Sequence, residues 1–538
     1  MVVCLDLELG KFGVIPTLCR NCKSQNADSR KVTSRPNYPG FPASHGEETD
    51  PLLSELPTCP GLFYGSSAQD GMLARMRIPG GILTDRQCDA IADLADQSGA
   101  GYVQVTNRAN VQIREIHTPI TPDVFHRLQT LELAAQTISL DPIRNIMASP
   151  TAGIDSQMLI DTRPLVKALD DYLQTHPKLA ALSPKFSVCF DGGEWVSVRD
   201  RRNDIGLVAH RLPSSEIGFR VCLNVEAHNS GDVGVFVSEN QCLAFIAALT
   251  QVYLDYTQGY YSGKGRKPRF RHLLASWDVE SCLERVEHLL GFSLRREASL
   301  LRSSPQSYNH LGIHPQRQTG LSYLGIAVPL GRLESWQLRN LAKLTRQNSG
   351  TLRLTPWQTI LFPDVADDRL GNLEGAIADL GFHTSATHFE SALVACSGRK
   401  GCASGLTDTQ TQALGLVELT AHLDQPLNIH FSGCEKSCAQ QTPSDIALVG
   451  IEMKAGNSTI EGYDVYVGTR DSSFGRRIRS VSALEVTSLI KQMLQIYQQQ
   501  RMLDESFKMF VDRHSMDQLQ QWFSSKNNQY LTSHSITG

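Results

Sequence analysis

The stretch RIPGGILTDRQCDAIADLA (residues 77–95) occurs twice in this chain, the second time as AVPLGRLESWQLRNLAKLT (327–345), at a shift of 250 residues. Both copies have the pattern of a strand, a tight turn and an amphipathic helix. In the first copy Thr84 and Gln87 have the spacing of a capping box, which marks the start of the helix. The aligned identities include Pro79 with Pro329, Gly81 with Gly331, Leu83 with Leu333 and Gln87 with Gln337.

The repeat extends beyond this stretch. A pair of strand-like segments follows each predicted helix, at 102–116 and 351–365. Further on, DIGLVA (204–209) returns as DIALVG (445–450) at a shift of 241 residues, and VCFDGG (188–193) falls on IHFSGC (429–434). We therefore expect an α+β protein with a pseudo-twofold, duplicated arrangement A-B-A′-B′ of about 250 residues per half. Each A module is a small β-α-β-β unit, each B module is a larger α+β unit, and a site is expected where the halves meet.

The expected boundaries follow the repeat and the composition. Residues 1–55 are polar and are broken by Pro36, Pro39, Pro42 and Pro51, so we expect a disordered extension there. Residues 481–538 are expected to form a helical segment that packs on B′, with a weakly ordered tail from about residue 524. The modules between them are A at 56–125, B at 126–310, A′ at 311–375 and B′ at 376–480.

Bulk composition limits the classes of function. A chain of 538 residues is too long for one hydrophobic core, and 41% hydrophobic with 20% charged residues is typical of a soluble globular protein. A formal charge of −4 gives no reason to expect nucleic acid. No apolar run reaches the roughly 20 residues that a membrane span needs. The acidic residues Asp6 and Glu8 argue against a signal peptide, so a cytoplasmic location is expected.

Thirteen cysteines in such a chain indicate a reducing compartment, and four of them are clustered in ACSGRKGCASG (395–405) and FSGCEKSCAQ (431–440) of module B′. Buried core thiols and a zinc site are both compatible with this pattern, although the spacing C-x₅-C is wide for zinc. A [4Fe–4S] cluster fits it better, because the cluster needs unequal spacings and small neighbouring residues. The predicted ligands are Cys396, Cys402, Cys434 and Cys438.

The order C-x₅-C…C-x₃-C, together with the repeat, resembles the sulfite and nitrite reductase superfamily over about residues 59–515. The resemblance implies two ferredoxin-like half-modules and two larger α+β modules. It also implies that the four cysteines hold a [4Fe–4S] cluster and that Cys438 bridges to the iron of a sirohaem, where that haem is bound.

Within the superfamily, the chain is most similar to the precorrin-3B synthases. Four stretches carry this likeness: CPGLFYG (59–65), RLTPW (353–357), CASGLTDT (402–409) and SGCEKSCA (432–439). The likeness implies an O₂-dependent monooxygenase that hydroxylates precorrin-3A with lactone formation in aerobic cobalamin biosynthesis. It also implies a mononuclear non-haem iron, for which His210 and His430 are weak candidates.

A tetrapyrrole with acetate and propionate arms should be bound by cations. The residues that match basic tetrapyrrole ligands of the superfamily are Arg77, Arg108, Arg144 and Lys185. Where the family has a second lysine this chain has Ser187, which suits a tetrapyrrole that comes and goes as substrate. The equivalents of Arg77 and Arg108 in A′ are Ala327 and Trp357, and the basic run SGKGRKPRFR (262–271) is interpreted mainly as a solvated loop.

Electrons must come from another protein, because the chain has no G-x-G-x-x-G after a strand and no P-loop motif. A ferredoxin or a separate reductase is the expected donor. Two alternatives stay open at this point. One is a ferredoxin-dependent sirohaem nitrite or sulfite reductase, and the other is a non-catalytic zinc or iron–sulfur protein.

Overall fold

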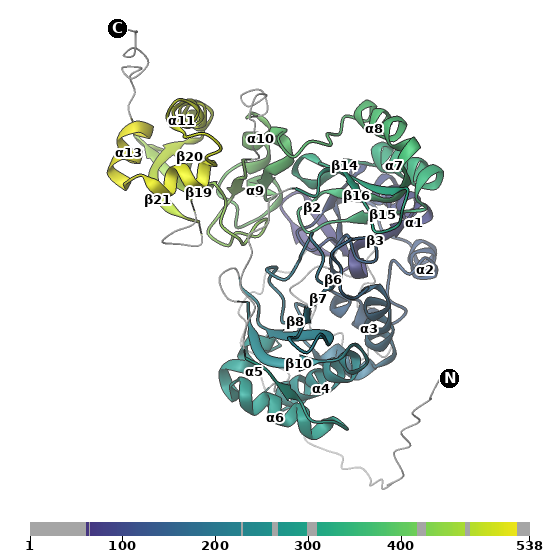
Figure 1. Ribbon diagram of the computed structural model, residues 1–538. Helices are drawn as coiled ribbons and strands as arrows, with labels where there is room; N and C mark the ends of the chain where they lie inside the picture. Colours follow the sequence, from purple (N-terminus) through teal and green to yellow (C-terminus); the bar gives the residue numbers. More distant parts are fainter. Residues whose placement is uncertain are drawn as a thin grey trace, which may run out of the picture. The chain divides into compact units, whose positions relative to one another are not determined.

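The computed structural model describes residues 61–63, 65–226, 230–260, 267–298, 309–416, 427–468 and 474–524 (Figure 1). The predicted extension 1–55 and the predicted tail from about residue 524 lie outside the described residues, apart from Ser524 itself. Among the helices of the described part, none combines the length and apolar character that crossing a bilayer would require.

Modules A and A′ each contain a five-stranded antiparallel sheet, and each sheet includes one strand from the other module. The A sheet has the order β1-β2-β5-β4-β14, and the A′ sheet has the order β12-β13-β16-β15-β3. Strand β3 of the first half pairs with β15, and β14 of the second half pairs with β4. The bounds are β1 Ser66–Ala68, β2 Gly71–Met76, β3 Ile82–Thr84, β4 Tyr102–Val105, β5 Val111–Ile116, β12 Gly312–Pro315, β13 Leu321–Ile326, β14 Arg332–Glu334, β15 Thr351–Leu354 and β16 Ile360–Ala366.

The repeated glycines explain this strand exchange. A side chain at Gly81 would place its Cβ 2.7 Å from the carbonyl oxygen of Leu354, and one at Gly331 would place it 2.8 Å from that of Val105. Both glycines also have positive φ, at 73° and 68°. Only glycine allows the turn to come this close to the other half, so the two identical positions connect the halves in the same way.

Helices α1 (Asp85–Ser98) and α7 (Ser335–Asn348) lie side by side and bury one shared core between the two modules (Figure 1). The predicted capping box of Thr84 and Gln87 is present at the start of α1. Two arginines of α7 bridge to α1: Arg339 pairs with Asp93 at 2.5 Å, and Arg346 pairs with Asp85 at 2.6 Å. The duplication predicted from sequence is confirmed.

Modules B and B′ contain sheets of the same design. In B the order is β11-β10-β9-β8-β7-β6, and in B′ it is β17-β18-β19-β20-β21. The first three strands along the chain are parallel in each sheet, and the later ones are antiparallel. The bounds are β6 Ile146–Ala148, β7 Val188–Asp191, β8 Ile205–Arg211, β9 Ile217–Leu223, β10 Asp232–Val237, β11 Arg295–Arg296, β17 Leu393–Ala395, β18 Ile429–Ser432, β19 Ile446–Ala455, β20 Ser458–Val467 and β21 Arg476–Ser482.

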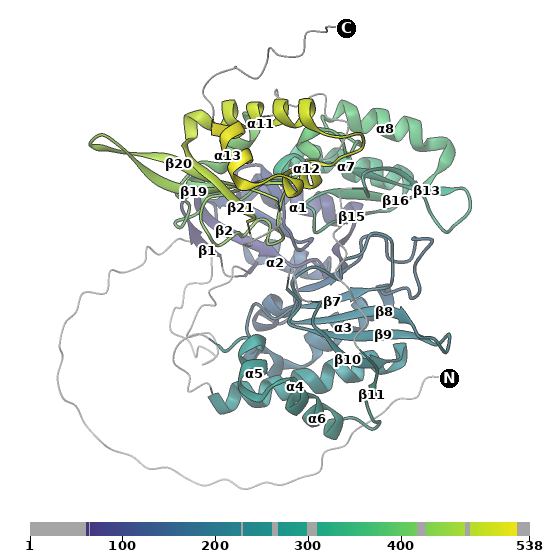
Figure 2. The same cartoon turned by 60° about the vertical axis from the view of Figure 1, so that its left-hand side comes forward.

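Helices pack on the sheets of B and B′ (Figure 2), whereas α2 and α8 pack in the shared core of A and A′. The bounds of the helices not yet given are α2 Pro122–Thr130, α3 Arg163–Thr175, α4 Cys242–Tyr260, α5 Phe270–Trp277, α6 Val279–Leu289, α8 Leu370–Asp379, α9 Gly398–Gly401, α10 Thr409–Leu414, α11 Val486–Gln500, α12 Phe507–Arg513 and α13 Met516–Ser524. The predicted C-terminal helix is present as α11, preceded by a capping box of Ser482 and Glu485, and it buries Leu489 and Met493 in the core of B′.

Candidate functional site

The four clustered cysteines follow two neighbouring strands of the B′ sheet. Cys396 comes directly after β17 and Cys434 comes two residues after β18, and these strands are parallel. Because parallel strands end at the same edge of a sheet, the two loops that carry the thiols meet there. Burial raises the pKa of the Cys438 thiol, and the other three cysteines raise it further. The structure thus brings the other three cysteines close enough to Cys438 to affect the charge state of its thiol.

Glycines make room around the sulfurs. The backbone amide of Gly433 donates a hydrogen bond to Sγ of Cys396 at 3.1 Å, and that of Gly398 donates to the same sulfur at 3.4 Å. A side chain at Gly405 would place its Cβ 2.5 Å from the carbonyl carbon of Gly398. Backbone amides directed at thiolates are the environment in which iron–sulfur clusters are held and their potentials set.

The spacing of the sulfurs separates a cluster from a single zinc ion. Four thiolates at about 2.3 Å from one tetrahedral zinc would lie roughly 3.8 Å from each other. In the part of the chain that the structure describes, only one set of three or more His, Cys, Asp or Glu has all its ligand atoms within 4.8 Å, and it contains none of these cysteines. No three of these sulfurs therefore lie within 4.8 Å of one another, a wider spacing than that of a single zinc site.

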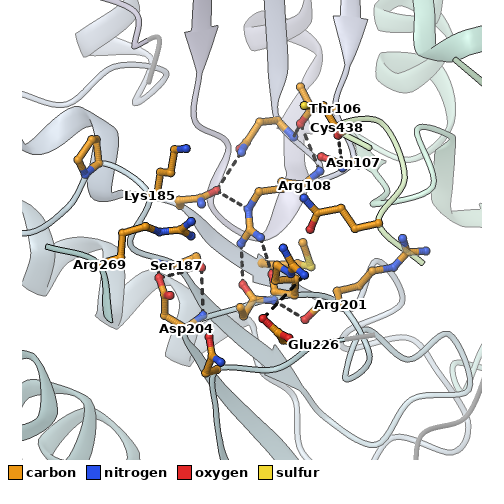
Figure 3. A pocket seen from close by; sticks show the side chains of 18 of the residues that line it. Thr106, Asn107, Arg108, Lys185, Ser187, Arg201, Asp204, Glu226, Arg269 and Cys438 are labelled. Carbon is orange, nitrogen blue, oxygen red and sulfur yellow. Dashed lines mark hydrogen bonds and ion pairs between the residues drawn. The ribbon is translucent and has the colours of Figure 1, made fainter. Parts of the chain in front are cut away.

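Cys438 also lines a cavity of about 340 Å³ that A, B and B′ form together (Figure 3). The cavity has a strong positive bias, because three acidic side chains, Asp200, Asp204 and Glu226, face eight cationic ones. The cations from A are Arg75, Arg77 and Arg108, and those from B are Lys185, Arg201, Arg202, Arg269 and Arg271. Such a lining fits a ligand with several carboxylates, or a small oxyanion.

Arg108 lies in the turn between β4 and β5 and extends into the cavity (Figure 3). Its guanidinium donates to Oδ1 of Asn145 at 3.0 Å, to the carbonyl oxygen of Arg202 at 2.8 Å and to Oδ1 of Asn203 at 2.6 Å. Burial lowers the pKa of Arg108 to about 10, so the group stays charged at neutral pH. All three acceptors are uncharged, which leaves the positive charge available to an anion.

The other predicted basic residues are placed differently. Arg77 is buried, with its Nε 3.4 Å from the carbonyl oxygen of Pro142, and Lys185 is exposed; both line the cavity. Arg144 does not line it. Arg144 forms a buried, bidentate ion pair with Asp170, at 2.7 and 2.9 Å. We therefore leave Arg144 out of the candidate binding residues.

Ser187, which replaces a family lysine, is part of the cavity wall. Its backbone amide and its hydroxyl both donate to Oδ2 of Asp204, at 3.0 and 3.4 Å. Burial raises the pKa of Asp204 to about 6, against the opposing effect of Arg269 and Arg108. The absence of a lysine at this position does not leave the cavity short of positive charge.

Several lining residues were not singled out from the sequence. Arg75 could have been found, since it lies two residues before Arg77 on an extended strand, where alternate side chains share a face. Arg269 and Arg271 belong to the basic run that was interpreted as a solvated loop, yet both line the cavity. The run's first residues, up to 266, lie outside the described residues.

Trp357 and the two candidate histidines do not contribute to the cavity lining. Trp357 is almost buried, with the guanidinium carbon of Arg201 4.3 Å above its ring centre and the ring of His310 at 4.9 Å. His430 is buried, and this burial lowers its pKa to about 4, while His210 lies on β8. The expected mononuclear iron has no support from these positions.

Family models match most of the described chain. The model of the nitrite and sulphite reductase 4Fe-4S domain matches residues 139–294 and 390–530, and that of the nitrite/sulfite reductase ferredoxin-like half domain matches 66–131 and 314–380. The chain belongs to the nitrite and sulfite reductase family. The duplicated fold of this family is the one described above, with each half domain and each cluster-type domain present twice.

Individual relatives are ferredoxin–nitrite reductases. That of Synechococcus elongatus is 28% identical over 453 residues, covering 81% of this chain and 88% of the relative. The ferredoxin–nitrite reductase of Leptolyngbya laminosa is 30% identical over 436 residues, covering 76% of this chain and 82% of the relative. Among solved structures, the Mycobacterium tuberculosis NirA protein aligns with a TM-score of 0.71 at 23% identity over 83% of this chain and 84% of that one, which supports the fold.

The expectation of a precorrin-3B synthase is wrong. The relatives that match over most of the chain are nitrite reductases, including the chloroplastic enzyme of Zea mays at 29% identity. Two features that favoured the synthase do not discriminate in the structure, because Ser187 still borders a cation-rich cavity and Trp357 lies behind the lining residue Arg201 without lining the cavity itself. The expected monooxygenase activity and the expected precorrin-3A substrate depended on that assignment, so they are withdrawn as well.

Proposed function

We propose that this protein is a ferredoxin-dependent nitrite reductase, an oxidoreductase that reduces nitrite with electrons from a ferredoxin. The observation that carries the proposal is the position of Cys438. Its thiol belongs to the four-cysteine site, and the residue also lines the cation-rich cavity. A redox centre and an anion-binding cavity therefore meet at one residue. The names of the relatives over most of the chain support nitrite as the anion and ferredoxin as the donor.

The residues present fit the cofactors of the family. Cys396, Cys402, Cys434 and Cys438 would hold the [4Fe–4S] cluster, and the cavity cations would hold the carboxylate arms of sirohaem. When bound, sirohaem supplies an iron at which a small oxyanion can be reduced. The hydrogen-bonded guanidinium groups of Arg77, which is buried, and Arg108, which is half-buried, suit a permanently held, polyanionic group, because their geometry is set before it binds.

The remaining cations can act on the substrate. Nitrite is an anion, and the excess of positive charge in the cavity raises its local concentration. Lys185 is exposed in the cavity, so its ammonium group can donate hydrogen bonds to an entering oxyanion. Reduction of nitrite also consumes protons, and an ammonium group is able to hold one beside the reacting oxygen.

The test is a purification under anaerobic conditions followed by cofactor and activity measurements. We expect iron and inorganic sulfide in amounts that fit one [4Fe–4S] cluster, no zinc at the cysteines, and the visible bands of an extractable sirohaem. Reduced ferredoxin should then support consumption of nitrite. Preference for sulfite over nitrite would reassign the substrate, and a protein with zinc but no sulfide would refute the enzyme proposal.

A further inference from the structure

A second group of metal-binding side chains lies outside the cavity, in the segment between α8 and β17. It consists of His383, His388 and Glu390, whose ligand atoms all lie within 4.8 Å of one another. Of the residues that the structure describes, this is the one set of three or more His, Cys, Asp or Glu with such spacing. None of the three lines the cavity described above.

The ligand atoms of the three side chains lie close together. The imidazole rings of His383 and His388 are stacked with centroids 3.6 Å apart and an angle of 15° between their planes. Oε2 of Glu390 lies 3.4 Å from Nε2 of His383. Nδ1 of His388 is buried and has no hydrogen-bond partner among the described residues. A buried ring nitrogen without a partner costs free energy, and a bound cation would remove that cost.

Hydrogen bonds of the main chain hold the segment in place without any metal. The carbonyl oxygen of His383 accepts from the amide of Ala327 at 2.7 Å, which ties it to the A′ module. At the other end, the amide of Ser391 donates to the carbonyl oxygen of His388 at 2.9 Å. The Ser391 hydroxyl donates to the carbonyl oxygen of Ser385 at 2.6 Å. The main chain that carries the ligands is thus fixed in advance, and binding one ion requires only that the stacked imidazole rings turn until their in-plane lone pairs converge.

We propose that His383, His388 and Glu390 bind one zinc ion. Two imidazoles and one carboxylate are a donor set that zinc accepts, with water able to complete the coordination. Magnesium and calcium prefer oxygen ligands alone and are disfavoured by the two histidines. The three residues are partly exposed, so an ion can enter from solvent.

The site would be a structural zinc site close to the four cysteines. Glu390 lies three residues before β17, and Cys396 follows the last residue of that strand. His383 is bonded to Ala327 of A′. A zinc ion across these side chains therefore fixes the start of β17 to the edge of A′, and it stabilises the module that carries the four cysteines. This inference holds whatever anion the enzyme reduces.

Zinc binding to the full-length protein with its iron–sulfur cluster assembled tests the proposal. The protein is treated with a chelator, its iron and sulfide contents are verified, and zinc is titrated in competition with a chromophoric chelator. We compare the wild type with His388→Ala and Glu390→Gln, and with His126→Ala, an exposed histidine of α2, as the control. The wild type and the control should bind one more zinc ion than the two variants, or bind it at least about tenfold more tightly.

Cobalt and thermal unfolding give independent readouts. Co²⁺ at this site should show ligand-field bands without the intense thiolate-to-metal charge-transfer band that a cysteine site gives. Zinc should raise the melting temperature of the wild type and leave that of Glu390→Gln unchanged. Equal zinc binding by the wild type and the variants, or a thiolate band in the cobalt spectrum, would overturn the proposal. If His388→Ala does not fold, the zinc affinity and melting temperature of the nearly isosteric Glu390→Gln variant test the proposal without it.

Discussion

Nδ2 of Asn107 donates a hydrogen bond to the carbonyl oxygen of Cys438 at 2.9 Å, across 331 residues of sequence (Figure 3). Asn107 is next to Arg108 in the turn between β4 and β5, and Cys438 is the cysteine that reaches the cavity. This bond therefore links the anion-binding wall of module A to the cysteine loop of module B′. The relative position of the two depends partly on a single side chain.

Replacing Asn107 by Ala should lower kcat while the cluster stays assembled. One lost hydrogen bond is worth about 1 kcal/mol, so we expect a decrease of roughly fivefold. Steady-state kinetics with nitrite and reduced ferredoxin measure this, with KM changed less than kcat. Asn340→Ala is the control, because Asn340 donates the same kind of bond to Trp336 on the exposed surface of α7. Equal rates for Asn107→Ala and the wild type would show that the link has no role in positioning.

The duplicated fold was predictable because both halves kept the same local signals. Proline, glycine and the capping residues recur at one shift, and these residues determine where a turn ends and a helix begins. The exchange of β3 and β14 between the two sheets was not predictable from this pattern. A strand of three residues has the same sequence signal whichever sheet it joins, and the partner is decided by the close approach at Gly81 and Gly331.

The candidate site shows where sequence reasoning succeeds and where it fails. The unequal spacing of the four cysteines pointed to a cluster, and the family model that matches this part of the chain is that of a 4Fe-4S domain, while the four ligands themselves stay a prediction. The sequence does not distinguish Arg144 from Arg108. In the structure Arg144 forms an ion pair with Asp170, whereas Arg108 donates hydrogen bonds to uncharged acceptors. The partner of an arginine is set by tertiary packing. Assignment to the synthase failed because it relied on short stretches, some of which lie outside the cavity.

Cys402→Ser should abolish cluster assembly, because a serine hydroxyl is not a thiolate ligand at neutral pH. The iron and inorganic sulfide contents should fall far below those of one cluster per chain, and nitrite reduction should be lost. Cys282→Ala is the control, since Cys282 is buried in α6, away from the four cysteines. A Cys402→Ser protein with full sulfide content and turnover would contradict the ligand assignment.

Arg108→Ala should weaken binding of the anionic ligands of the cavity without affecting the cluster. A charge-assisted contact is worth about 1.5 to 3 kcal/mol, so sirohaem retention or nitrite affinity should fall roughly ten- to a hundredfold. Visible spectroscopy and KM for nitrite report the two effects, and iron and sulfide counts should stay unchanged. Arg296→Ala, which removes an exposed arginine paired with Glu280, serves as the control. Unchanged sirohaem content and unchanged KM would show that the cavity binds neither ligand.

Arg144→Ala should act on stability instead. Removing one partner of a buried ion pair leaves the Asp170 carboxylate without a counter-charge and with the amide of Gln174 as a neutral donor, at a cost of about 3 to 5 kcal/mol in the free energy of unfolding. Arg295→Ala, which breaks an exposed pair with Glu216, should leave the free energy of unfolding nearly unchanged, because solvent screens that pair. Denaturant unfolding measures both. If Arg144→Ala unfolds like the wild type but loses sirohaem, then Arg144 binds the cofactor after all.

Stability should fall as the pH drops below neutral, and His310 should be one cause. Burial, with a further contribution from Arg201, lowers the pKa of His310 from 6.5 to about 3. Because the folded state binds this proton less readily than the unfolded state, the stability due to the neutral ring is complete above pH 6.5. It is lost progressively as the pH falls towards 3. The free energy of unfolding, measured between pH 7 and 4, should decrease less steeply in His310→Gln, whose amide can still meet the Thr359 hydroxyl that lies 2.8 Å from the imidazole. An identical slope in both proteins would mean that His310 is already protonated in the folded state, or that it is solvated there.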